Sequence, residues 1–203
     1  MATAGTYLDI FEHGLGQAQT TAVHVAQALR ADESILRRGK RGFGALSLTA
    51  AEASNWLIAL AAPIAPTAKA PSPIETVRSV RAASRLPASG RHDVMDGLSV
   101  ADASTFGEAL DSLLRDMRSG TFRAWQGRGG MTLNIRFVDG GRLAIVYAAR
   151  WFTGSQPHSE SAEIVFRNES CAGANRAYAF TRINQISHEV LEKIAEALGP
   201  LPS

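Results

Sequence analysis

The sequence predicts an α+β protein, with a helical first half followed by an antiparallel sheet that is backed by helices. Three observations carry this prediction. Capping-box signatures mark helix starts at residues 49, 72 and 105. From residue 131 onwards apolar and polar residues alternate, as they do in a half-buried strand. The triplet Asp139-Gly140-Gly141 then favours a tight hairpin turn, because glycine adopts a positive φ without strain.

Each of the three helix starts carries the pattern Ser/Thr-x-x-Glu. In this pattern the hydroxyl accepts a hydrogen bond from the third helical amide, and the glutamate accepts one from the amide of the capping residue. The pairs are Thr49 with Glu52, Ser72 with Glu75, and Thr105 with Glu108. Residues 15–29 and 187–198 have apolar residues at helical spacing, so we expect further helices there. The apolar stripe of the last helix is Val190, Leu191, Ile194 and Leu198.

Strands are expected in the second half over residues 131–138, 142–152, 162–166 and 176–183. On the second of these strands one face carries Leu143, Ile145, Tyr147 and Trp151. The aromatic residues of this half alternate with aliphatic ones, which favours packing in a core over the alternative of stacking on RNA bases. These aromatic residues are Trp125, Phe137, Tyr147, Trp151, Phe152 and Phe166.

A boundary between two domains is expected near residue 90. Residues 89–103 contain glycine and serine and show little periodicity, which predicts a linker. The chain then divides into a helical domain over residues 1–88 and an α+β domain over residues 104–203. The α+β domain is expected to form a homodimer, to bind a ligand or to contact a protein partner.

The formal net charge of +2 divides unevenly along the chain. Residues 1–91 contain ten Lys and Arg against six Asp and Glu, a difference of +4. Residues 92–203 contain eleven against thirteen, a difference of −2. This asymmetry indicates that the first part of the chain meets an anionic partner and that the second part does not.

Targeting signals are not expected in this sequence. The first residues lack the charged and apolar regions of a signal peptide. No stretch approaches the roughly 18 apolar residues of a membrane span. The single cysteine, Cys171, allows no disulfide within the chain. We therefore expect a cytoplasmic protein without a membrane partner.

Four cations lie close together among glycines: Arg37, Arg38, Lys40 and Arg41. Three interpretations are open for them, namely a phosphate cradle, a DNA-contacting wing and a solvated loop. A phosphate cradle fits poorly, because no strand precedes the glycines and no Gly-Lys-Ser/Thr sequence ends them. A wing would act through its charge, since cations that bind phosphates release counterions.

Polar side chains at the start of the preceding helix favour the wing over the solvated loop. Such side chains donate to and accept from base edges and phosphates. They are Gln17, Gln19, Thr20, Thr21 and His24. A second basic group has spacings of three and four residues and is expected on one helix face. It consists of Arg78, Arg81 and Arg85.

Residues 15–62 resemble the front domain of proteins that are common in alphaproteobacterial phages and prophages. The matches are Leu29-Arg30, Ile35-Leu36, Arg41-Gly42, Thr49 and residues 57–60. The resemblance implies a helix-turn-helix-like domain in a phage-type regulator, and it implies no defined target. The sequence departs from the pattern at Asp32-Glu33, which are acidic where a turn of small residues is expected.

Catalytic motifs give little support to an enzyme. His158-Ser159-Glu160 is similar to one half of a zinc-deaminase site, but the Pro-Cys-x-x-Cys half is missing from the sequence. Cys171 and His188 lack the flanking sequence of a nucleophile and its base. We therefore expect no catalytic residues, no metal and no cofactor.

These observations favour a sequence-specific DNA-binding regulator of phage or prophage type. Residues 1–88 would form its DNA-binding domain, and double-stranded DNA would be its partner. The alternative is a phage-encoded protein-interaction module, an inhibitor or accessory factor, whose basic loop meets an acidic protein surface.

Overall fold

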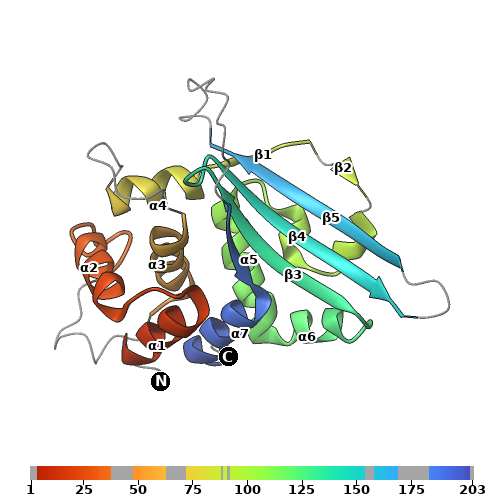
Figure 1. Ribbon diagram of the computed structural model, residues 1–203, viewed down its shortest axis with the longest axis horizontal. Coiled ribbons are helices and arrows are strands. Elements are labelled where there is room, and N and C mark those ends of the chain that lie inside the picture. The colour runs from red at the N-terminus through yellow and green to blue at the C-terminus, as the bar shows by residue number, and fades with distance from the viewer. Residues whose placement is uncertain are drawn as a thin grey trace.

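The helices of the first half gather at one end of the molecule (Figure 1). They are seen in a computed structural model, which describes residues 4–37, 48–62, 72–87, 89–90, 92–153, 158–168 and 183–201. The helices of this half are α1 (Ala4–Leu15), α2 (Gln19–Leu29), α3 (Ala50–Ala61) and α4 (Pro73–Arg81).

The second half contains the sheet and the helices that cover one of its faces. Its first elements are β1 (Ser84–Arg85), β2 (Ser89–Gly90), η2 (His92–Met95), η3 (Ser99–Asp102), α5 (Phe106–Ser119) and α6 (Thr121–Gln126). The elements that follow are β3 (Met131–Val138), β4 (Leu143–Phe152), β5 (His158–Arg167), β6 (Ile183–Ser187) and α7 (His188–Leu198). The predicted α+β class is confirmed.

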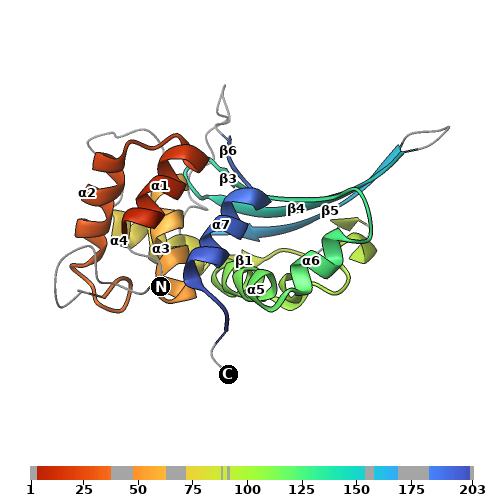
Figure 2. The ribbon, with the colours of Figure 1, turned by 90° about the horizontal axis from the view of Figure 1, so that it is seen from below.

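The sheet is antiparallel, with the strand order β1-β5-β4-β3-β6, and β2 also pairs with β5. Helices α5, α6 and α7 lie on one side of it (Figure 2). The predicted hairpin turn between β3 and β4 is confirmed, because Asp139, Gly140 and Gly141 all have positive φ. The strand predicted over residues 162–166 is longer at both ends. Of the strand predicted over residues 176–183, only Ile183 lies within the described residues, and β6 begins there.

All three predicted capping boxes are present, at the starts of α3, α4 and α5. The helix predicted over residues 15–29 is confirmed over Gln19–Leu29 but starts later than predicted, because the chain turns at Gly16. This residue has a φ of +64°, which does not fit a right-handed helix. As a result α1 ends at Leu15 and α2 begins at Gln19.

One cluster of buried apolar residues runs through both halves of the chain. Phe106 is fully buried, and its ring meets the rings of Phe137 and Phe166 edge-on at centroid distances of 5.5 and 5.7 Å. α5 also packs on α3 and α4, and α1 packs on α7. The α1–α7 contact is close, since a Cβ at Gly14 would lie 2.7 Å from a methyl group of Val190. The helical half and the sheet half therefore share this core.

The described part of the predicted linker packs on the fold, with β2 and η2 against the sheet and η3 against α5. Val94, Leu98 and Val100 are buried there, and the Trp125 indole donates to the Val94 carbonyl over 2.9 Å. The lack of periodicity reflects 3₁₀ turns, which are too short to show a helical pattern. Independent folding of residues 1–88 and 104–203 stays a prediction.

The face of β4 that carries Leu143, Ile145, Tyr147 and Trp151 points away from the helices. The covered face carries small residues instead, with Ala144, Val146 and Ala148 buried beneath the helices. Large side chains from the helices, such as Phe106 and Phe122, fill the space that the alanines leave. The prediction of core packing is therefore wrong for Trp151, which is 56% exposed. For Trp125, Phe137 and Phe166 it is confirmed.

Candidate nucleic-acid interface

The polar start of α2 is fixed by the buried side of the same helix. Ala22, Ala26 and Leu29 are fully buried, and the Trp56 indole of α3 donates to the Ala22 carbonyl over 3.0 Å. Because buried residues recur every three or four positions, the opposite side of α2 faces solvent. Three of the predicted contact residues are exposed there: Thr20, Thr21 and His24.

A short turn joins α1 to α2 and sets the direction of α2. It consists of Gly16, Gln17 and Ala18, and Gly16 has a positive φ. Gln17 is half-buried, and its backbone amide donates to the Phe11 carbonyl over 3.4 Å. Two helices joined by a short glycine-containing turn are typical of helix-turn-helix proteins, whose second helix contacts base edges with its N-terminal residues.

Gln19 is exposed but is held by the acidic side of α1. Its side-chain nitrogen Nε2 donates to the Asp9 carboxylate over 3.1 Å and to the Glu12 carboxylate over 2.6 Å. This places two carboxylates beside the first turn of α2, a position where negative charge is favoured by the helix dipole. The same carboxylates repel phosphates, so Gln19 is the predicted contact least suited to DNA.

Glu52 bonds both Arg37 and Thr49, which flank residues 38–47, a segment outside the described part of the chain. Its carboxylate accepts from the Arg37 amide over 3.1 Å, and from Arg37 Nε and Nη2 over 2.6 and 2.8 Å. It also accepts from the Thr49 amide and hydroxyl over 2.8 and 3.0 Å. Glu52 is 6% exposed, whereas the Arg37 side chain is 56% exposed. Arg37 is thus an anchor at the base of the loop.

The charge of Glu52 is stabilised strongly by these donors. Burial alone would raise the pKa of its carboxyl group, but the hydrogen bonds from Arg37 and Thr49 outweigh burial. The net effect lowers the pKa of Glu52 from 4.5 to about 2. Glu52 is therefore ionised throughout the physiological range and keeps its bonds to both ends of the loop.

Arg38, Lys40 and Arg41 lie outside the described residues. Arg37 and Leu48 are the described residues on either side of them. Arg37 donates to the Glu52 carboxylate, and Leu48 precedes Thr49, which donates to the same carboxylate.

The second basic group does not form one helix face. α4 ends at Arg81, so Arg85 lies in β1 and the helical spacing does not extend to it. Arg78 pairs with Asp32, one of the two acidic residues at which the sequence departs from the phage-protein pattern. The Arg78 side chain is 65% exposed. Arg81 pairs with Asp111 of α5 over 2.5 Å, and Arg85 donates to the Ala101 carbonyl. Arg81 and Arg85 thus link elements of the fold, whereas Arg78 keeps most of its side chain in solvent.

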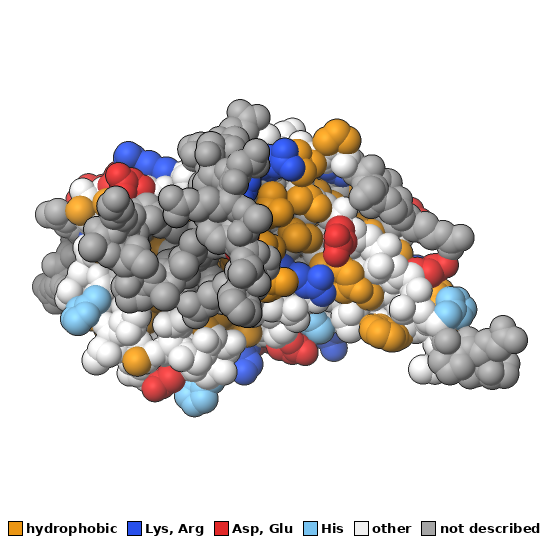
Figure 3. Space-filling model, turned by 45° about the horizontal axis from the view of Figure 1, so that its top comes forward, with side chains coloured by type: hydrophobic (Ala, Val, Ile, Leu, Met, Phe, Trp, Pro, Cys, Tyr) orange, Lys and Arg blue, Asp and Glu red, His pale blue; other side chains and the backbone are white. Residues whose placement is uncertain are grey.

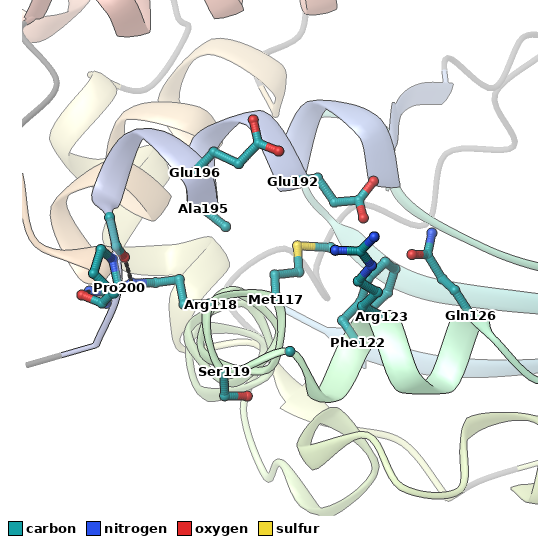
Figure 4. Close-up of a pocket in the computed structure, with 12 residues that line it drawn as sticks. Met117, Arg118, Ser119, Phe122, Arg123, Gln126, Glu192, Ala195, Glu196 and Pro200 are labelled. Carbon is teal, nitrogen blue, oxygen red and sulfur yellow. Dashed lines mark hydrogen bonds between the residues drawn. The ribbon is translucent and has the colours of Figure 1, made fainter. Parts of the chain in front are cut away.

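A groove of about 780 Å³ lies between the α5–α6 turn and α7, away from the predicted contacts. Arg118 is fastened at one end of it, because Nε and Nη2 donate to the carbonyls of Gly199 and Pro200 over 2.7 and 2.9 Å. At the other end Glu192 of α7 lies opposite Arg123 and Gln126 of α6 (Figure 4). Both signs of charge line this groove, so its lining does not select an anion or a cation.

Residues with catalytic or metal-binding chemistry are dispersed. Among the described residues no three His, Cys, Asp or Glu side chains gather to form a metal site. His188 Nδ1 lies 3.3 Å from the Leu133 carbonyl, and the His158 ring stacks on Phe152 at a centroid distance of 4.4 Å. Cys171 lies outside the described residues.

None of the described helices combines the length and the apolar character that crossing a membrane requires.

The acidic residues of α1 were missed by the sequence analysis, which expected no helix there. The signal was nevertheless present, since Tyr7, Ile10 and Phe11 are buried and fall at helical spacing.

No protein-family model matches the chain, and no curated protein or solved structure matches it either.

Proposed function

We propose that this protein is a sequence-specific DNA-binding regulator of phage or prophage type, in which α2 enters the major groove. The single observation that supports this function best is the polar, exposed start of α2 after the glycine turn. Thr20, Thr21 and His24 are the side chains proposed to reach base edges. An α-helix fits the major groove, and its first residues are those that meet the bases.

The basic loop would supply the phosphate contacts. Arg38, Lys40 and Arg41 follow Arg37 in the sequence, and Arg37 is tied to Glu52 at the start of α3. α3 in turn holds α2 through the bond from Trp56 to Ala22. Base-reading and phosphate-binding residues would therefore be connected through one rigid helix, which favours a fixed register on DNA.

Three of the cations predicted to contact DNA take lesser roles in this proposal. Arg37 serves as an anchor, and Arg81 and Arg85 link elements of the fold. Arg78 remains a phosphate-contact candidate, because an exposed arginine can share its guanidinium between Asp32 and a phosphate.

Base reading is tested by binding to a selected duplex and to random duplexes. A preferred site is first selected from a random duplex pool with the full chain. Binding of His24→Ala and of Thr20→Ala/Thr21→Ala is then measured by fluorescence anisotropy on both kinds of duplex. Each change should weaken binding to the selected duplex by about 1–3 kcal/mol and leave binding to random duplexes nearly unchanged.

Gln27→Ala is the matched control, because Gln27 is exposed on α2 but lies two turns beyond its start. It should bind both duplexes as the wild type does. If His24→Ala and the Thr20/Thr21 variant weaken both duplexes by the same factor, α2 does not read bases and this function is wrong.

A second candidate function is a protein-interaction module. It is favoured by the sheet face opposite the described helices, which no described element covers and which we call the open face. Trp151 and Ile183 lie there with 56% and 54% of their surface exposed. Failure of the wild type to bind any duplex at low salt would leave this function as the better account.

A further inference from the structure

The sheet has one covered face and one open face, and the open face carries apolar side chains. Figure 3 shows hydrophobic side chains gathered over the described part of this face, interrupted by basic and acidic ones. Among the described residues, the large apolar side chains classed as exposed are Trp151, Ile183 and Leu201. Two of these three lie on the open face, which is unusual for a face that only meets water.

The apolar residues of this face are contiguous across strands. The pairing register places Ile183 beside Val138, Val138 beside Leu143, and Ile145 beside Val165. Residues in register on neighbouring strands have Cβ atoms about 5 Å apart, so their side chains touch. Ile183, Val138, Leu143, Ile145 and Val165 thus form one aliphatic patch, with Trp151 at the other end of β4.

The described charged groups beside the patch include an opposite pair on the two strands that flank β4, and Arg167 lies exposed on β5 in register with Leu143. Arg136 on β3 covers the Tyr147 ring, with its Cζ 4.2 Å from the ring centroid. Its Nη1 lies 3.7 Å from the Glu163 carboxylate on β5. Both side chains remain accessible, at 29% and 43% exposure. This pair, placed across a central strand, is complementary in charge to the same pair of a second copy.

We infer that a second copy of this chain packs face to face on the open face, with a two-fold axis along β4. Because β3 and β5 lie on opposite sides of β4, this axis places β3 of each copy over β5 of the other. Arg136 then faces the partner's Glu163, and the contact occurs twice. Ile145 and Leu143 lie over the partner's aliphatic patch. Two sheets packed in this way interdigitate their side chains at a separation of about 10 Å.

The size of the face suits such a dimer. β3, β4, β5 and β6 contain 8, 10, 10 and 5 residues. With a rise of about 3.4 Å per residue and about 4.8 Å between strands, these four strands cover on the order of 540 Å² on each copy. The total of about 1,100 Å² exceeds the roughly 1,000 Å² that a specific interface requires. The contact does not include α2, so it stands independently of DNA binding.

Charge reversal tests this dimer with the full chain in solution. Sedimentation velocity should give twice the chain mass of 21.6 kDa for the wild type at micromolar concentration. Arg136→Glu and Glu163→Arg each place like charges opposite one another at two points, and each should weaken the dimer by about tenfold or more. The double variant Arg136→Glu/Glu163→Arg restores both pairs and should dimerise as the wild type does. Circular dichroism establishes that each variant is folded.

A second comparison uses exposed apolar residues, whose replacement leaves the core intact. Trp151→Glu should weaken the dimer, whereas the matched control Leu201→Glu should not, because Leu201 lies beyond α7 and away from the open face. A monomeric wild type overturns the inference. A dimer that Arg136→Glu and Trp151→Glu leave intact overturns it as well.

Discussion

In the helical half, Arg37 and Arg78 lie against carboxylates of the same fold, whereas in the sheet half Trp151 and Ile183 expose more than half of their surface. The first half is rich in cations, yet its described arginines are largely engaged within the fold. The second half has a nearly balanced charge, yet it exposes two large apolar side chains on its sheet. The described charges of the first half therefore serve its structure, and the second half leaves apolar surface accessible.

A charged residue is available to a partner outside the chain only if no opposite charge of the same fold lies beside it. Glu52, Asp32 and Asp111 each take up one arginine, so the cations available to an external anion are fewer than the sequence suggests. On α2, the polar side chains of Thr20 and His24 are exposed to solvent.

The largest effect is expected at Phe106, where the two halves share one core. Phe106→Ala removes a fully buried ring that touches Phe137 and Phe166, and it should lower the free energy of unfolding by about 3–5 kcal/mol. Urea unfolding followed by fluorescence measures this change. Trp56 reports on the helical half and Trp125 on the sheet half, because both are buried.

Single-tryptophan variants, one keeping Trp56 and one keeping Trp125, show whether the halves respond together. With a shared core, Phe106→Ala should shift both transitions by the same amount. A shift confined to the Trp125 transition would show that the helical half unfolds as a separate domain.

A smaller effect is expected at Glu52, which holds the base of the basic loop. Glu52→Gln removes the charge that Arg37 and Thr49 donate to, and it should lower the free energy of unfolding by about 2–3 kcal/mol at pH 7. Since the folded pKa of about 2 lies below the ordinary value of 4.5, the contribution of Glu52 is fully present above pH 4.5. It should be lost progressively as the pH falls from 4.5 towards 2.

Glu75→Gln is the matched control for Glu52, because Glu75 occupies the same capping-box position in α4 but is exposed to solvent and, among the described residues, forms no ion pair with an arginine. Its replacement should change stability much less. Equal losses in the two variants would mean that the capping box alone, without Arg37, accounts for the role of Glu52.

The smallest effect is expected at Gly16, which turns the chain between α1 and α2. Its φ of +64° is unfavourable for a residue with a Cβ, although no atom lies within 4 Å of the Cβ position. Gly16→Ala should therefore cost about 1 kcal/mol of stability through backbone strain alone. Gly16→Asn should cost less, because asparagine tolerates this conformation. Thermal unfolding of the two variants compares them, and equal losses would refute strain as the cause.

Local patterns in the sequence were sufficient to predict the helix starts, β3 and the hairpin turn. Thr49, Ser72 and Thr105 cap their helices as predicted, because a capping box involves only residues three apart. The positive φ of Gly140 follows equally from its turn sequence. These features depend on neighbours along the chain, which the sequence displays.

Long-range pairing could not be predicted from the sequence. Nothing near Arg81 indicates Asp111, and nothing near Arg37 indicates that Glu52 would accept from its guanidinium. The open face of β4 was also assigned to the core, because alternation alone does not say which face the helices cover. The alanines at 144 and 148 were the available signal, since small residues permit close packing of helices on that side.

The salt dependence of DNA binding tests most directly whether the helical half carries the function. The triple variant Arg38→Ala/Lys40→Ala/Arg41→Ala is compared with a triple variant of exposed cations in the second half, Arg115, Arg123 and Lys193. Both remove the same charge from the chain. The loop variant should make the log–log salt slope shallower by roughly 0.9 per lost phosphate contact, so by up to about 3. The second-half variant should keep the slope of the wild type. An unchanged slope in the loop variant, or an equal change in both, would contradict the proposed interface.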